Sequence, residues 1–132
     1  MEKLVVDITW DGNFGAYSDV LTGCVATHKT LEGVKEAYNS ALQMHIMGME
    51  EDGEIVPAIF KGGFEVLYRL NTQALLKSID GKISRAAIAR ASGINERQLG
   101  HYITGRVAPR AENRKKVVEG IHQIAKDLLE VV

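Results

Sequence analysis

Three hydrogen-bonding side chains, Glu96, Arg97 and His101, recur at spacings that place them on one face of a helix. A glutamate carboxylate can accept a hydrogen bond from the amino group of cytosine, and an arginine guanidinium can donate two to guanine. The imidazole of His101 can donate or accept. This face could therefore read base edges in the major groove of DNA. The alternatives are a solvated surface histidine and a glutamate that only favours the helix N-terminus.

A second set of polar side chains is better placed for phosphate oxygens than for bases. This set consists of Arg85, Asn95, Gln98 and Arg106. Phosphate contacts fix the register and orientation of a protein on the duplex but carry no sequence information. We therefore expect these residues to support binding to DNA of any sequence.

Two short helices joined by a glycine corner would position these side chains. Ser84 is a good N-cap, Gly93 tolerates the left-handed corner, Asn95 begins an Asn-x-x-Gln capping box and Gly105 ends the second helix. The apolar positions expected to pack together are Ile88, Ile94, Leu99, Tyr102 and Ile103. This is the format of a helix-turn-helix, and residues 84–109 resemble the Cro/C1-type helix-turn-helix family. The alternative is a plain helical hairpin with solvated charges.

The net charge of −1 conceals an uneven distribution along the 132 residues. Residues 1–80 contain 6 Lys and Arg against 12 Asp and Glu, whereas residues 81–132 contain 10 against 5. A basic C-terminal part suits nucleic acid, and an acidic N-terminal part could attract a basic protein. The single Cys24 excludes an internal disulfide and fits a reducing compartment. Because no apolar run approaches the ~20 residues of a membrane span and no signal-peptide pattern is present, we expect a cytoplasmic protein with no membrane association.

The N-terminal part reads as strands followed by a helix. Alternating apolar residues over 3–10 predict a half-buried strand, and 14–18 and 23–28 predict two more, which together form a three-stranded meander. Thr30 can cap a long helix with an apolar stripe. Residues 64–70 supply further extended material, and a helix over 72–79 is predicted to begin the C-terminal module.

The final segment, from about residue 110 to 132, is long and amphipathic. A module of four short helices rarely needs so long an apolar stripe for its own core. One interpretation is that part of the stripe forms a dimer interface. Packing on its own domain is the alternative.

Four segments of the N-terminal part carry a resemblance to a known family. They are Phe14-Gly-Ala-Tyr-Ser18, Leu21-Thr-Gly-Cys-Val-Ala-Thr27, Thr30-Leu31-Glu32 and Glu50-Glu-Asp-Gly-Glu54. In this order they resemble the HicB antitoxin family. The resemblance implies a partial RNase H-like fold over residues 1–70, followed by a DNA-binding part. The expected fold class is α+β, with an antiparallel meander plus helix followed by an all-α helix-turn-helix DNA-binding domain over 71–132.

The resemblance also implies a function. Members of this family neutralise a small mRNA-cleaving toxin called HicA by direct binding, and they repress the promoter that the two proteins share. The implied partners are a HicA-like toxin, operator DNA with an inverted repeat, and further copies of the chain in a homodimer or higher even oligomer. Four acidic residues are candidates for toxin contact, although a solvated loop explains them equally well: Glu50, Glu51, Asp52 and Glu54.

Two other functions compete with the antitoxin hypothesis. The first is a free-standing helix-turn-helix transcriptional regulator with an N-terminal ligand-sensing or dimerisation domain. The second is an RNase H-type nuclease, which needs several carboxylates around two metal ions. Only Asp7 and Glu36 suggest such a set, so we expect no catalytic residues, no cofactor and no enzymatic activity. The four histidines show no metal-ligand spacing with Cys24, and a metal site is not expected either.

Overall fold

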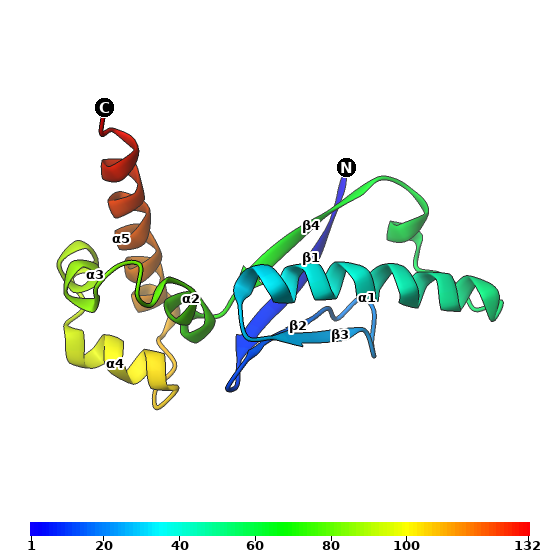
Figure 1. The fold of residues 1–132 in the computed structure, drawn as a ribbon, viewed down its shortest axis with the longest axis horizontal. Coiled ribbons are helices and arrows are strands. Elements are labelled where there is room, and N and C mark those ends of the chain that lie inside the picture. Colours follow the sequence, from blue (N-terminus) through cyan, green and yellow to red (C-terminus); the bar gives the residue numbers. More distant parts are fainter. The chain divides into compact units, whose positions relative to one another are not determined.

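The computed structural model describes residues 1–132 and contains strands and helices in a mixed order (Figure 1). The elements are β1 (Glu2–Trp10), β2 (Phe14–Tyr17), β3 (Val25–His28), α1 (Leu31–Glu51), the short 3-10 helix η1 (Ala58–Lys61), β4 (Phe64–Leu70), α2 (Thr72–Ile79), α3 (Arg85–Ser92), α4 (Glu96–Thr104) and α5 (Ala111–Leu129). The chain divides into two compact units, Met1–Ala74 and Leu75–Val132. None of its helices has both the length and the apolar character that crossing a membrane requires.

The first unit is built on a four-stranded sheet in the order β3-β2-β1-β4. The pairs β1–β2 and β2–β3 are antiparallel. The pair β1–β4 is parallel, with Glu2 opposite Phe64 and Ile8 opposite Leu70. Parallel neighbours cannot be joined by a tight hairpin, and the connection from β1 to β4 contains α1.

The predicted arrangement of the α+β fold is wrong. Its N-terminal part is a mixed sheet rather than an antiparallel meander, because β4 adds a parallel strand beside β1. The predicted division into a β part followed by an all-α helix-turn-helix domain is not established either. Helix α1 already follows the first three strands, so helices are not confined to the C-terminal part. The structure shows an α+β chain with a four-stranded sheet and five α-helices. Alternation of apolar residues identifies a buried strand face but says nothing about the direction of its neighbour.

The core of the first unit lies between the sheet and α1. Leu4, Val6 and Ile8 alternate along β1 and are fully buried, and Val34 and Tyr38 from α1 are buried in the same cluster. Side chains on one face repeat every two residues along the strand and every three to four residues along the helix. These residues therefore lie on the two faces that meet. The Thr30 hydroxyl accepts a hydrogen bond from the backbone N–H of Gly33 at 3.0 Å, which confirms the predicted helix cap.

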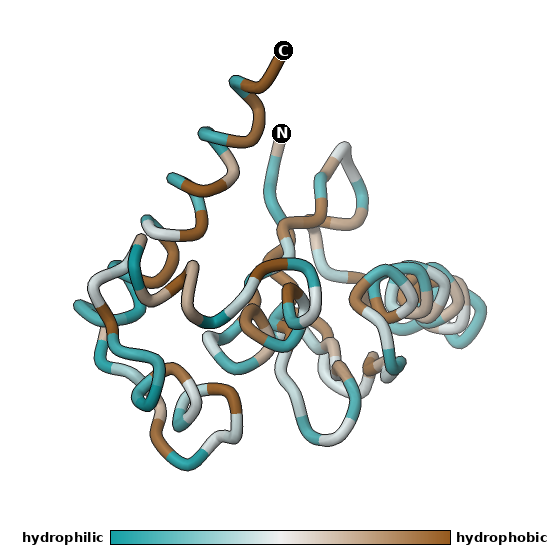
Figure 2. The backbone as a smooth tube through the Cα atoms, turned by 60° about the vertical axis from the view of Figure 1, so that its left-hand side comes forward, coloured by the Kyte–Doolittle hydropathy of each residue, from teal (hydrophilic) through white to brown (hydrophobic).

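The core of the second unit is formed by α2, α3, α4 and α5. Its buried apolar residues are Leu76, Ile88, Ile94, Leu99, Tyr102, Ile103 and Val117. The five residues predicted to pack together are all among them. Hydrophobic residues recur along α5 as far as the C-terminal end of the chain (Figure 2). Only part of this helix therefore contributes to the core of its own unit.

Candidate nucleic-acid interface

Local hydrogen bonds define the ends of α3 and α4. The Ser84 hydroxyl accepts from the N–H of Ala87 at 3.1 Å, and the Asn95 carboxamide oxygen accepts from the N–H of Gln98 at 2.8 Å. Gly93 and Gly105 end the two helices with φ angles of 77° and 78°, a conformation that glycine adopts without steric cost. The predicted caps at Ser84 and Asn95 and the glycine corner are confirmed, but the Gln98 half of the predicted capping box is not, because that side chain bonds to Tyr102 instead.

The three predicted base-reading residues share one face of α4. Glu96 and Arg97 are exposed, and His101 is half-buried one turn further along. The opposite face carries Leu99 and Tyr102, which are almost fully buried. Because neither Glu96 nor Arg97 forms an ion pair within the chain, their side chains are free to contact an external ligand.

The four predicted phosphate-contacting residues fall into two groups. Arg85 and Arg106 are exposed, and an Arg85 guanidinium nitrogen lies 3.4 Å from where a Cβ atom on Gly100 would stand. The Arg85 guanidinium therefore lies close to Gly100, beside the outward face of α4. Asn95 caps α4, and the Gln98 amide donates to the Tyr102 hydroxyl at 3.1 Å. The side-chain amides of Asn95 and Gln98 therefore already form hydrogen bonds within the second unit.

A small hydrogen-bond network that the sequence did not predict attaches α4 to α5. The Tyr102 hydroxyl accepts hydrogen bonds from the amides of both Gln98 and Asn113, each at 3.1 Å. The hydroxyl belongs to an otherwise buried side chain, and it needs such partners because burying an unpaired polar group is costly. The network holds α4 in a fixed position within its unit and thereby orients Arg97 and His101.

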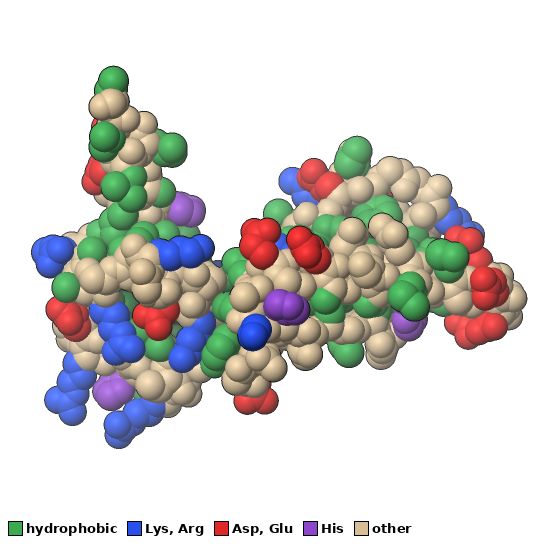
Figure 3. All heavy atoms as spheres, in the orientation of Figure 1, with side chains coloured by type: hydrophobic (Ala, Val, Ile, Leu, Met, Phe, Trp, Pro, Cys, Tyr) green, Lys and Arg blue, Asp and Glu red, His purple; other side chains and the backbone are tan.

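Positive charge gathers over the unit that carries α3 and α4. Figure 3 shows several Lys and Arg side chains over this unit, with few acidic ones between them. Residues 81–132 have twice as many basic as acidic residues. Such a surface attracts the phosphate backbone of DNA irrespective of sequence.

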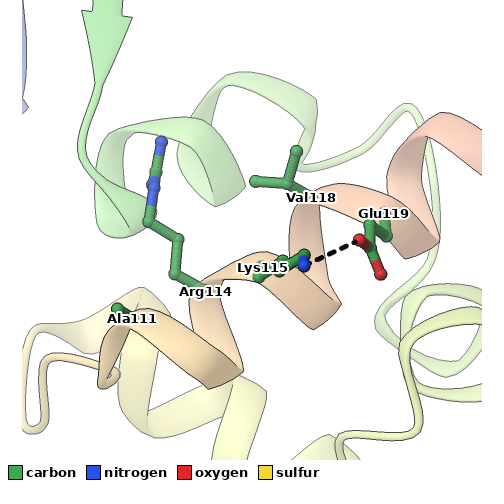
Figure 4. Close-up of a pocket in the computed structure, with 5 residues that line it drawn as sticks. All are labelled: Ala111, Arg114, Lys115, Val118 and Glu119. Carbon is green, nitrogen blue, oxygen red and sulfur yellow. Dashed lines mark ion pairs between the residues drawn. The ribbon is translucent and has the colours of Figure 1, made fainter.

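An open hollow of about 470 Å³ lies along one side of α5 (Figure 4). Its lining residues all come from that helix and are Ala111, Arg114, Lys115, Val118 and Glu119. Lys115 and Glu119 form a long, exposed ion pair of 3.9 Å, which contributes little to stability. The sequence analysis did not single out this hollow, although the spacing of its residues places them on one side of a helix.

The acidic candidates lie together at the C-terminal end of α1. Glu50, Glu51, Asp52 and Glu54 are all exposed, and Figure 3 shows acidic side chains grouped there. Three large apolar side chains nearby in the sequence are exposed as well: Met44 at 73%, Met47 at 59% and Ile55 at 90%. The sequence analysis predicted the acidic residues as candidates but not the exposure of these apolar side chains.

The two carboxylates considered for nuclease chemistry do not come together. Asp7 alternates with Val6 and Ile8 on β1 and so points to the sheet face opposite α1. It forms a two-pronged ion pair with Arg69 of β4, at 2.7 and 3.2 Å, and this pairing raises the pKa of Arg69. Glu36 is an exposed residue of α1. The ion pair gives Asp7 a role in joining two parallel strands.

Cys24 is a core residue. Its side chain is 2% exposed and lies in the first core with Tyr38. Burial raises the pKa of the Cys24 thiol, so the reactive thiolate is disfavoured.

No protein-family model and no curated protein matches this chain. A functional assignment therefore depends on the residues and geometry described above. The resemblance to the HicB family stays a prediction.

Proposed function

We propose that this chain is an antitoxin that binds operator DNA through α3 and α4 and neutralises a basic, HicA-like toxin through its first unit. The observation that carries the DNA-binding half is the outward face of α4. This face presents Glu96, Arg97 and His101 without internal ion pairs, while its opposite side is anchored in a buried core.

In the proposed complex, α4 enters the major groove. Arg97 donates two hydrogen bonds to a guanine, and Glu96 accepts one from a cytosine. Arg85 and Arg106 contact phosphates on either side, because they flank α4 and are exposed. Repression follows if the bound site overlaps the promoter of the chain's own operon.

The negative charge of the first unit supports the proposed binding of a toxin. The first 80 residues carry twice as many acidic as basic side chains, and four exposed acidic residues are grouped at the end of α1. A toxin that cleaves mRNA needs a basic surface to bind its substrate. An acidic unit seated on that surface would exclude the RNA. We propose no catalytic role for any residue.

The α4 face is tested on DNA from the region upstream of the chain's own gene. Arg97→Ala should reduce discrimination at one base pair by about 1–3 kcal/mol, measured by fluorescence anisotropy with base-substituted duplexes. Arg85→Ala should weaken binding to all sequences and reduce the salt slope by about 1. Lys61→Ala is the control, since it removes one positive charge from the first unit. Wild-type binding by both arginine variants would refute the proposed docking.

The acidic cluster is tested by co-expressing the full chain with the product of the neighbouring gene. The double variant Glu51→Lys and Asp52→Lys should lose growth rescue, because it places positive charge against a basic toxin. Arg97→Ala is the matched control and should rescue growth like the wild type.

Two outcomes would revise the toxin-binding half of the proposal. Full rescue by the charge-reversed variant would show that the toxin binds elsewhere. If the wild-type chain forms no complex with its neighbour but still binds DNA specifically, the alternative of a free-standing regulator with a ligand-sensing or dimerisation domain is favoured.

A further inference from the structure

Two methionine side chains on the outward face of α1 are exposed to solvent. Met44 is 73% exposed and Met47 is 59% exposed, and their spacing makes them neighbours on one face of the helix. The opposite face, which carries Tyr38 and Leu42, is buried in the first core. Nothing lies within 4 Å of a Cβ atom built at Gly48, the residue after Met47. The chain therefore leaves both thioether groups open to solvent.

Uncompensated negative charge lies next to these methionines, at the C-terminal end of α1 (Figure 3). Glu50 and Glu51 lie in the last turn of the helix, which contains no basic residue. None of the four exposed acidic residues at this end forms an ion pair within the chain. Backbone carbonyl groups give the end of a helix a partial negative charge, so acidic side chains are unfavourable there without a cationic partner. A basic partner with apolar side chains would match both the charge and the methionines.

We propose that Met44 and Met47 are a site of reversible oxidation that controls the binding of this basic partner. Hydrogen peroxide transfers one oxygen atom to a thioether sulfur. The O–O bond breaks, an S–O bond forms, the sulfur is oxidised to a sulfoxide and the peroxide is reduced to water. Because a sulfoxide is polar, its burial against an apolar surface of the partner is no longer favourable. Methionine sulfoxide reductases reverse the change.

The third methionine of α1 is protected from the same reaction. Met49 is half-buried and packs against the first core, so peroxide reaches its sulfur less readily. Oxygen added to Met49 would place a polar group against that core, whereas oxygen added to Met44 and Met47 stays on the solvent side of the helix. Oxidation of the two exposed methionines therefore changes the surface of α1 and leaves its packing intact.

This inference rests on the proposed function, because the basic partner is the toxin proposed to bind the first unit. The two can nevertheless fail separately. A reduced chain that does not bind the product of the neighbouring gene would refute the proposed function and, with it, the control by oxidation. A chain that binds this product equally well before and after oxidation would refute only the oxidation site.

The test oxidises the full chain before the partner is present. The chain is treated with hydrogen peroxide, catalase removes the peroxide, and the product of the neighbouring gene is added. Mass spectrometry of peptides should find Met44 and Met47 oxidised before Met49. Isothermal titration calorimetry should show that the Kd rises about tenfold or more, because two apolar contacts are lost. Methionine sulfoxide reductases with dithiothreitol should restore the Kd.

Circular dichroism of the oxidised chain separates the site from an effect on folding. The helical signal should remain that of the reduced chain, because Met44 and Met47 are exposed. A loss of helical signal would overturn the proposal, since oxidation would then act on the fold instead of on the binding surface. Oxidation of Met49 before the two exposed methionines would overturn it as well.

The double variant Met44→Leu and Met47→Leu is the matched control. Leucine is close to methionine in volume and carries no sulfur, and the variant keeps Met1 and Met49. It should bind the partner with about the affinity of the reduced wild type, and peroxide should leave that affinity unchanged. A loss of affinity in the oxidised variant would overturn the proposal, because the effect would then come from Met1, Met49 or Cys24.

Discussion

Leu99→Ala is expected to lower the free energy of unfolding of the second unit by about 2–5 kcal/mol, the usual cost of removing a large buried side chain. Leu99 is fully buried at the centre of the second core. Its loss leaves a cavity beneath the helix face that carries Arg97. Urea denaturation of the full chain, followed by far-ultraviolet circular dichroism, measures the change because this unit is rich in helix.

Val107→Ala is the control for this prediction, since Val107 is 41% exposed and its truncation should cost about 0.5 kcal/mol or less. Trp10, the single tryptophan, lies on β1 and reports the first unit by fluorescence. Its transition should shift less than the helical signal. Equal midpoints for Leu99→Ala and Val107→Ala would mean that the second core is not organised around Leu99.

Local signals predicted the ends of the helices well. Ser84 and Asn95 cap helices because their side chains reach a backbone N–H only three residues away. Gly93 and Gly105 end helices because they adopt positive φ. Each of these helix ends depends only on residues within one or two turns, so it can be predicted from the local sequence.

Pairings between distant segments could not be predicted in the same way. The alternation of apolar residues over 64–70 indicated an extended segment, but its parallel pairing with β1 depends on where α1 returns the chain. The ion pair between Asp7 and Arg69 follows from that register and joins residues 62 positions apart. The sequence analysis considered Asp7 only as a possible catalytic carboxylate.

In the candidate site, too, some features could be predicted from the sequence and others could not. The period of a helix placed Glu96, Arg97 and His101 on one face, and the structure agrees. The engagement of Gln98 with Tyr102 was not predictable, because Asn113 of another helix also binds that hydroxyl. The proximity of Arg85 to Gly100 likewise depends on how α3 packs against α4. Side-chain roles inside a module are set by its packing, which periodicity alone does not specify.

Gly120→Ala is expected to destabilise the chain even though alanine is the better helix former. A Cβ atom at residue 120 would lie 2.8 Å from the backbone nitrogen of Ser92 and 2.9 Å from its Cα atom. Backbone atoms cannot rotate away as a side chain can, so α3 must move relative to α5. We expect a net loss of about 1–2 kcal/mol, since overpacking outweighs the gain in helix propensity.

Gly48→Ala in α1 is the matched control for the Gly120 variant. Nothing lies within 4 Å of a Cβ atom built at Gly48. Alanine there only reduces the backbone entropy that is lost on folding, so the free energy of unfolding should rise by about 0.5–1 kcal/mol. Urea denaturation of both variants therefore compares one substitution in two helices with opposite expected signs. Stabilisation by Gly120→Ala would mean that α3 and α5 do not approach as closely as described. The close approach matters for function because α3 carries Arg85 and leads directly into α4.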